Sequence, residues 1–333
     1  MATNPDKLQL AKTFDHKAIA FAVARVPNTM RVYLGCSDFK VYEADLAAMK
    51  YEPKELYAHG SYVTGVALAG KTLVSGGYDG KLTWFDTDAK KVIRSVEAHA
   101  KWIRGVVASR DGKTVVSVAD DMVARVWDAG TGNKLHELRG HAEKTPTGFV
   151  SMLYAASFSP DGKLVATGDK VGKVFVWDVA TGKQVAELEA PTFYTWDAAA
   201  RNHSIGGIRA LAFSPDGKAL AIGGIGKIGN IDHLEGKARV EVFDWAEKKR
   251  TWEYQSDKFQ GIVNHLMYAP DGGWLLAAGG AGEGFLIFLD VAAKKALRQE
   301  KLPMHTHDVT ANETADTLIA VGHHKIAMFE MKA

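Results

Sequence analysis

The feature that most limits how this chain can fold is a short ending that recurs seven times. In each copy a run of apolar residues closes with a large apolar side chain followed by an acid. The seven acids stand 40 to 66 residues apart, by subtraction of their numbers. A unit of roughly 40–45 residues that holds four short strands is typical of a propeller blade. The endings are Tyr42-Glu43, Phe85-Asp86, Trp127-Asp128, Trp177-Asp178, Phe243-Asp244, Leu289-Asp290 and Phe329-Glu330.

Tight turns precede these endings. Two copies read Phe158-Ser159-Pro160-Asp161-Gly162-Lys163 and Phe213-Ser214-Pro215-Asp216-Gly217-Lys218, and weaker copies stand at 109–113 and 269–273. Proline presets φ for the first corner, aspartate caps the turn, and glycine takes the left-handed position. Each copy therefore predicts a hairpin. The sequence as a whole predicts an all-β, seven-bladed β-propeller in a single domain, residues 1–333.

The two ends of the sequence predict how the array closes. The seventh acid is Glu330 and the sequence ends at Ala333, so the last blade lacks room for a fourth strand. Residues 8–14 precede the first complete unit and resemble the missing strand. We expect this N-terminal strand to pair with the last blade and close the ring, because an open array would expose a blade face at each end.

The unit from His99 to Asp128 resembles a WD repeat. In that family a histidine, a Ser/Thr, an aspartate and a tryptophan form one hydrogen-bonded tetrad in each blade, and His99, Ser117, Asp121 and Trp127 match all four by spacing. Partial matches stand in two other units. They are His59, Ser75 and Asp79 with Phe85 in place of the indole, and His141, Thr167 and Trp177 with Val171 in place of the aspartate.

A serine, a histidine and an aspartate together also suggest a hydrolase. Here the three residue types recur once per blade, where a buried polar chain holds turns together and satisfies its own donors and acceptors. We therefore interpret them as structural and expect no catalytic residues. The resemblance to WD-repeat proteins implies a rigid scaffold that binds proteins or peptides.

The composition of the chain disfavours some classes of binding partner. Forty-one basic and 39 acidic residues leave a net charge of +2, which provides no general attraction for nucleic acid or an anionic membrane surface. Cys36 is the single cysteine, so the chain can form no disulfide within itself. The sequence shows no apolar run long enough to span a bilayer and no secretory leader. We expect a cytoplasmic monomer without a cofactor.

One group of residues raises the possibility of a metal site. The seventh unit contains His305, His307, Asp308, His323 and His324, on or near loops that share one face. Imidazoles and a carboxylate are ligands for zinc or a similar ion. Their spacing matches no metal signature, however, and histidines in loops are usually solvated. We therefore predict no metal.

Long insertions predict where a partner binds. They lie between His141 and Asp161, between the fourth and fifth units, and at 227–237, and all three are expected over blades four and five. Long loops on a rigid scaffold commonly carry binding residues, and aromatic and arginine side chains are typical anchors. The predicted binding residues are Trp102, Phe193, Tyr194, Trp196, Arg201, Asp232 and His233.

The sequence is also compatible with two other functions. A binder of small ligands or glycans would use the Phe193, Tyr194 and Trp196 rings as stacking platforms. A propeller enzyme would hold a divalent metal in the axial funnel, and it would need carboxylates or histidines from several blades, a set that the spacing does not reveal.

Overall fold

The computed structural model describes residues 3–197, 203–229 and 235–331. They form β-strands and two short 3₁₀ turns, η1 (Pro5–Lys7) and η2 (Pro191–Phe193), with no α-helix among them. None of the described segments is a helix that could cross a bilayer. The strands make seven four-stranded antiparallel sheets and one two-stranded hairpin. The chain is therefore an all-β propeller with seven blades, as the sequence predicts.

The chain divides into two compact units. The first is Met1–Glu137 with His307–Ala333, and the second is Leu138–Thr306. Blades one, two, three and seven are centred in the first unit. Their strands, in spatial order, are β2 (Ala20–Arg25), β3 (Arg31–Cys36), β4 (Lys40–Asp45), β5 (Lys54–Ala58); β6 (Val63–Ala69), β7 (Thr72–Gly77), β8 (Lys81–Asp86), β9 (Lys91–Glu97); β10 (Ile103–Ala108), β11 (Thr114–Ala119), β12 (Val123–Asp128), β13 (Lys134–Arg139); and β28 (Thr306–Ala311), β29 (Thr317–Gly322), β30 (Lys325–Met331), β1 (Leu8–Asp15).

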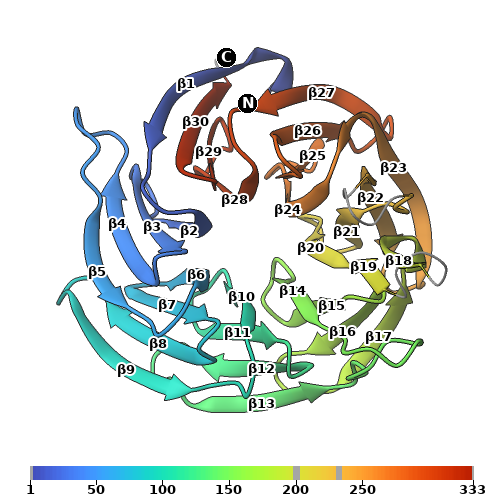
Figure 1. Ribbon diagram of the computed structural model, residues 1–333, viewed down its shortest axis with the longest axis horizontal. Helices are drawn as coiled ribbons and strands as arrows, with labels where there is room; N and C mark the ends of the chain where they lie inside the picture. Colours follow the sequence, from blue (N-terminus) through green and yellow to red (C-terminus); the bar gives the residue numbers. More distant parts are fainter. Residues whose placement is uncertain (1–2, 198–202, 230–234, 332–333) are drawn as a thin grey trace. The chain divides into compact units, whose positions relative to one another are not determined.

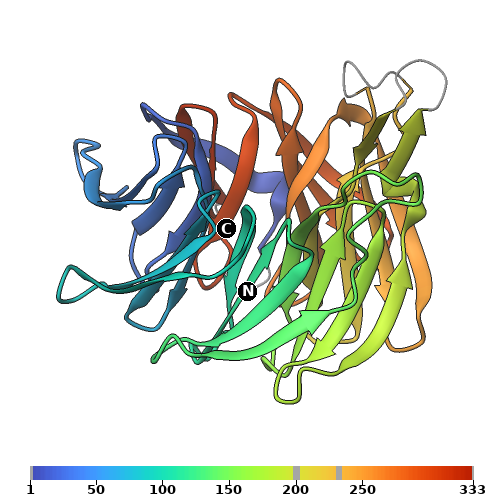
Figure 2. The same ribbon diagram turned by 60° about the horizontal axis from the view of Figure 1, so that its bottom comes forward.

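Blades four, five and six belong to the second unit, together with the hairpin. The sheet of blade four is green to yellow-green in Figure 2. The strands are β14 (Leu153–Phe158), β15 (Leu164–Asp169), β16 (Lys173–Asp178), β17 (Gln184–Glu189); β20 (Ile208–Phe213), β21 (Ala219–Ile225), β22 (Lys237–Asp244), β23 (Lys249–Gln260); β24 (Ile262–Tyr268), β25 (Trp274–Gly280), β26 (Gly284–Asp290), β27 (Lys295–Leu302); and the hairpin β18 (Tyr194–Asp197), β19 (His203–Gly206).

The N-terminal strand completes the seventh blade. β1 pairs antiparallel with β30, from Leu8 opposite Met331 to Asp15 opposite Lys325, and the two lie side by side in Figure 1. One register shift interrupts the ladder between Leu10 and Lys12. The predicted closing strand is therefore confirmed, and its length agrees with residues 8–14 of the sequence prediction.

The hydrophobic core of each unit lies between neighbouring sheets. In the first unit, for example, Val41 of blade one packs in one cluster with Val63 and Leu73 of blade two. Sheets come so close that a side chain is excluded at Gly65, where a Cβ atom would lie 2.7 Å from the backbone nitrogen of Val106. Inner strands buried on both faces explain why their sequences are apolar without alternation.

The predicted turns form through hydrogen bonds within each motif. The Ser159 hydroxyl donates to Asp161 Oδ1 at 2.6 Å, and the same oxygen accepts the backbone N–H of Lys163 at 3.1 Å. Gly162 has φ of 71°, in the left-handed region that glycine adopts without strain. These contacts confirm the predicted roles of aspartate and glycine.

Candidate functional site

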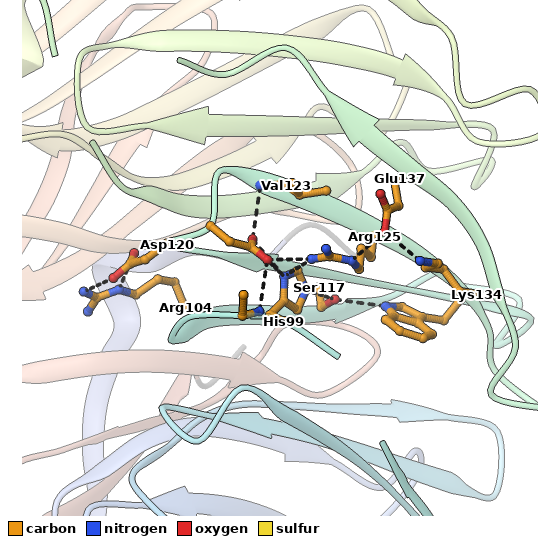
Figure 3. Close-up of polar contacts among 11 residues, drawn as sticks. His99, Arg104, Ser117, Asp120, Val123, Arg125, Lys134 and Glu137 are labelled. Atoms are coloured by element: carbon orange, nitrogen blue, oxygen red, sulfur yellow. Dashed lines mark hydrogen bonds and ion pairs between the residues drawn. The ribbon is translucent and has the colours of Figure 1, made fainter. Parts of the chain in front are cut away.

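The tetrad predicted for blade three is present and buried (Figure 3). His99 Nε2 lies 2.7 Å from Ser117 Oγ, and its Nδ1 lies 3.0 Å from Asp121 Oδ1. The Trp127 indole N–H donates to the same serine oxygen at 2.9 Å. Arg125 adds an ion pair with Asp121 at 2.8 Å. The chain of contacts ties the third strand, the second strand and the tight turn to the start of the blade.

The pKa shifts in this network follow from burial and from its internal hydrogen bonds. Burial lowers the pKa of His99, although Asp121 opposes that shift. Burial alone would raise the pKa of Asp121, but hydrogen bonds and charge from His99 and Arg125 hold it below its usual value. Ser117 is fully buried and its oxygen already contacts two partners. His99 could act as a base toward Ser117, but a hydroxyl that is fully buried is not accessible to a substrate.

Blade two replaces the missing indole in a way that the sequence reading did not anticipate. His59 contacts Ser75 Oγ at 2.8 Å and Asp79 Oδ2 at 3.2 Å, as predicted. The Tyr57 hydroxyl lies 2.9 Å from the same serine oxygen, and its ring stacks on Phe85 at 5.0 Å. The polar contact that Phe85 cannot make thus comes from β5, the outer strand of blade one. A tyrosine two residues before the histidine is the signal that could have revealed it.

The prediction that blade four lacks the aspartate of the tetrad is wrong. Val171 stands at the spacing where an aspartate was expected, but the acid is not missing. Asp169, at the end of β15, contacts His141 Nδ1 at 2.8 Å. His141 Nε2 contacts Thr167 Oγ1 at 2.8 Å, and Trp177 donates to that oxygen at 2.9 Å. The tetrad is complete because the aspartate occupies a position two residues earlier than in blade three.

The second unit brings its three long connections into contact. The rings of Phe149, before β14, and Trp196, in β18, are 5.3 Å apart. The backbone N–H of Ile228, after β21, donates to Thr195 Oγ1 at 3.0 Å. Short hairpin pairing between β18 and β19 holds the middle connection in an extended form. Each of these connections corresponds to one insertion noted in the sequence.

The aromatic residues predicted to bind differ in exposure. Phe193 is 1% exposed and packs in the core between blades four and five, so its ring anchors the segment. Tyr194 and Trp196 are half-buried. Trp102 is 49% exposed and belongs to the first unit, where it stacks on Tyr78. The other predicted binding residues, Arg201, Asp232 and His233, lie outside the described residues.

The histidines near blade seven make separate contacts. His305 Nδ1 lies 3.3 Å from the carbonyl oxygen of Ala281, and His324 Nδ1 lies 3.0 Å from that of Lys17. The His307 and His323 rings are 5.1 Å apart. Within the part of the chain that the structure describes, no three His, Cys, Asp or Glu side chains are grouped to hold a metal ion.

Seven four-stranded blades with recurring histidine–hydroxyl–tryptophan networks define the class of this chain, which is a WD-repeat β-propeller. The model of a related propeller family, described as outer membrane protein assembly factor BamB, matches residues 50–265. Since this match covers more than half of the sequence, the chain belongs to that family.

Relatives among known proteins agree with this class. Apoptotic protease-activating factor 1 of Rattus norvegicus is 30% identical over 46% of this chain and 11% of its own length. Nuclear distribution protein PAC1 of Arthroderma benhamiae is 29% identical, over 62% of this chain and 43% of its own. Eukaryotic translation initiation factor 3 subunit I of Candida albicans is 27% identical, over 57% and 46%. The chain thus spans less than half the length of each relative.

Proposed function

We propose that this chain is a noncatalytic scaffold that binds a protein or peptide. The class supports this proposal, and so does one relative's name, which makes it a subunit of a larger translation factor. The buried tetrads support it too, because they occupy their serine, threonine and histidine atoms in structural hydrogen bonds. We further propose that residues 1–333 act as one monomeric domain in the cytoplasm, consistent with a single buried cysteine and a net charge of +2.

The docking surface that we propose is the group of three long connections in the second unit, over blades four and five. The observation that carries this proposal is their mutual contact through Phe149 with Trp196 and through Ile228 with Thr195. Contact between loops reduces the conformational entropy that a partner would otherwise have to remove on binding. Exposed Phe149 and Val150, at 40% and 55%, add apolar area beside Trp196.

Three substitutions in the same segment test this surface. Trp196→Ala, alone or with Arg201→Ala, should abolish capture of a partner from cell lysate and leave the melting temperature close to that of the wild type. Phe193→Ala should instead lower the melting temperature, because it empties a core position. Capture by immobilised protein followed by mass spectrometry reads the first effect, and calorimetry reads the second. Undiminished capture by the Trp196 variant would refute the proposed surface.

A further inference from the structure

The first unit carries a continuous row of aromatic rings, of which only Trp102 is among the binding residues predicted from the sequence. We call it the aromatic strip. Its members come from blades seven, one, two and three, and neighbouring ring centroids are 4.5 to 5.7 Å apart. They stand at the starts of inner strands and in the turns between second and third strands. The strip consists of His307, Phe21, Phe39, Tyr62, Tyr78 and Trp102.

Three of these rings reach solvent. Phe39 is 40% exposed, Tyr62 is 41% exposed and Trp102 is 49% exposed. Single exposed aromatic residues are ordinary on protein surfaces, whereas a contiguous exposed group marks a site of interaction. The strip is contiguous because each exposed ring touches another member: Tyr62 lies 5.6 Å from Phe39 and 5.7 Å from Tyr78.

The Trp102 end of the strip is rigid. Its ring stacks on Tyr78 with an interplanar angle of 5°. The Arg104 guanidinium lies 4.9 Å from the Tyr78 ring and 5.2 Å from the Trp102 ring, in cation–π range. Arg104 is in turn held by Asp120 through two contacts, at 2.9 and 2.7 Å (Figure 3). The cation that supports the stack is therefore neutralised by a carboxylate.

Phe39 occupies its place at a conformational cost. Its φ is 73°, a value that a bulky side chain rarely adopts. The matching turn position is glycine in blades two and four, Gly80 and Gly172, and Met122 in blade three, and all three have positive φ. The exposed Phe39 ring is therefore held on a backbone conformation that glycine would adopt without strain.

The chemistry of the strip indicates an uncharged, extended ligand. The Tyr62 hydroxyl and the Trp102 indole N–H have no hydrogen-bond partner within the described residues, so both are available as donors to carbonyl oxygens. The one guanidinium that touches the rings is already paired. A polyanion such as single-stranded nucleic acid would need free cations along its backbone.

A proline-rich segment meets these requirements. In the polyproline II conformation its carbonyl groups are all unpaired and its rings lie flat on aromatic side chains. Its turn rises by roughly 9 Å over three residues. The ring separations from Tyr62 to Tyr78 and from Tyr78 to Trp102 are 5.7 and 4.5 Å, so these three rings lie within about one such turn of each other.

We propose that the aromatic strip is a second binding surface, separate from the long connections of the second unit, and that it binds a proline-rich peptide in the polyproline II conformation. The proposal goes beyond the scaffold function because it assigns a ligand chemistry to residues that the scaffold function does not need.

Titration calorimetry of the full chain with a proline decamer tests this inference. The wild type should bind with saturable heat. Trp102→Ala and Tyr62→Ala should each weaken binding by about tenfold, the scale of one lost stacking platform. Phe39→Gly should also weaken binding, yet raise the melting temperature because it relieves the strained φ. Gain of stability with loss of affinity is a result that a purely structural role for Phe39 does not give.

Matched controls separate this surface from the one proposed above. Trp196→Ala should leave decamer binding unchanged, and a glycine–serine decamer should give no heat. Absence of saturable heat with the proline decamer would overturn the inference, as would equal affinity in the Trp102 variant. Tighter binding of an oligothymidine decamer would assign the strip to nucleic acid instead. None of these results alters the capture experiment with Trp196, so the two proposals fail independently.

Discussion

At the scale of single residues, the buried networks show how one geometric requirement is met by different side chains. The hydroxyl in the second strand has the histidine as one partner and needs a donor as the other, since a buried polar group without partners is costly. In blade three the donor is the indole of Trp127. In blade two it is the phenol of Tyr57, which approaches from β5, the outer strand of blade one. The requirement is therefore conserved in space and not in sequence position.

Removing the Tyr57 hydroxyl tests this substitution of donors. Tyr57→Phe should lower the free energy of unfolding by about 1 kcal/mol, because Ser75 loses one buried hydrogen bond but keeps that to His59. Urea denaturation provides the measurement. Tyr62→Phe is the matched control, with an expected change within about 0.5 kcal/mol, since that ring is 41% exposed. A double-mutant cycle with Ser75→Ala should show coupling, and independent effects would contradict the assignment.

The ionisation of His99 and Asp121 predicts how stability varies with pH. The folded state lowers the pKa of His99 from 6.5, so the unfolded chain binds that proton first, and stability falls as the pH decreases below 6.5. The pKa of Asp121 is held below 3.8, so its contribution is present above that pH and is lost as the pH falls further. Urea midpoints measured between about pH 8 and pH 4 should show the first decline. His99→Gln should be less stable and should have a shallower slope below pH 6.5; an identical slope would exclude His99 as its source.

Sequence spacing predicted the network of blade three and only part of those in blades two and four. Spacing succeeds where the acid lies in the turn between the second and third strands, as Asp121 does between β11 and β12. It placed the acid of blade four at Val171 because it cannot reveal that Asp169 reaches His141 from the end of a strand. It also cannot reveal a contribution from another strand, such as that of Tyr57. Those details depend on side-chain reach in three dimensions.

At the scale of elements, repetition made the strands predictable and left the orientation of inserted residues open. Seven similar endings gave seven blades, and a surplus strand at one end matched a deficit at the other. The aromatic residues between blades four and five lie in an insertion that no other blade repeats, so no second copy indicates which way their side chains point. Phe193 lies in a 3₁₀ turn and points into the core, whereas Trp196 lies in β18 and meets Phe149. The η2 turn places Phe193, and the pairing of β18 with β19 places Trp196, so two different local structures set the difference.

The closing strand β1 should contribute strongly to stability. Deletion of residues 1–14 should sharply lower the melting temperature, because the backbone groups of β30 lose their ladder partners. Leu8→Ala should destabilise by about 2–5 kcal/mol, since Leu8 is 2% exposed, whereas Leu10→Ala should change little at 52% exposure. Scanning calorimetry measures all three variants. An unchanged melting temperature for the deletion would mean that the strand is not required for closure.

At the scale of the whole molecule, the order of the chain links the two compact units. The second unit is one continuous stretch, Leu138–Thr306, and the first unit contains the chain on both sides of it. When the second unit is folded, the distance between its two ends, Leu138 and Thr306, is fixed by its own structure. If it unfolded alone, the first unit would have to hold a flexible loop of about 170 residues, at a cost on the order of 4–5 kcal/mol in closure entropy. The chain order alone therefore couples the stabilities of the units and favours a single domain.

This coupling predicts that a cavity in one unit should lower the stability of the other unit as well. Phe285→Ala, at a fully buried position of the second unit, should cost about 3–5 kcal/mol. If residues 1–333 form one cooperative domain, strands β7 and β25, one from each unit, should lose protection at the same lowered urea concentration. Hydrogen exchange with mass spectrometry follows both strands in one sample. Leu297→Ala, at 38% exposure on β27, should shift neither. If β25 lost protection while β7 kept its wild-type midpoint, the chain would consist of two domains, and the closure entropy would be too small to join them.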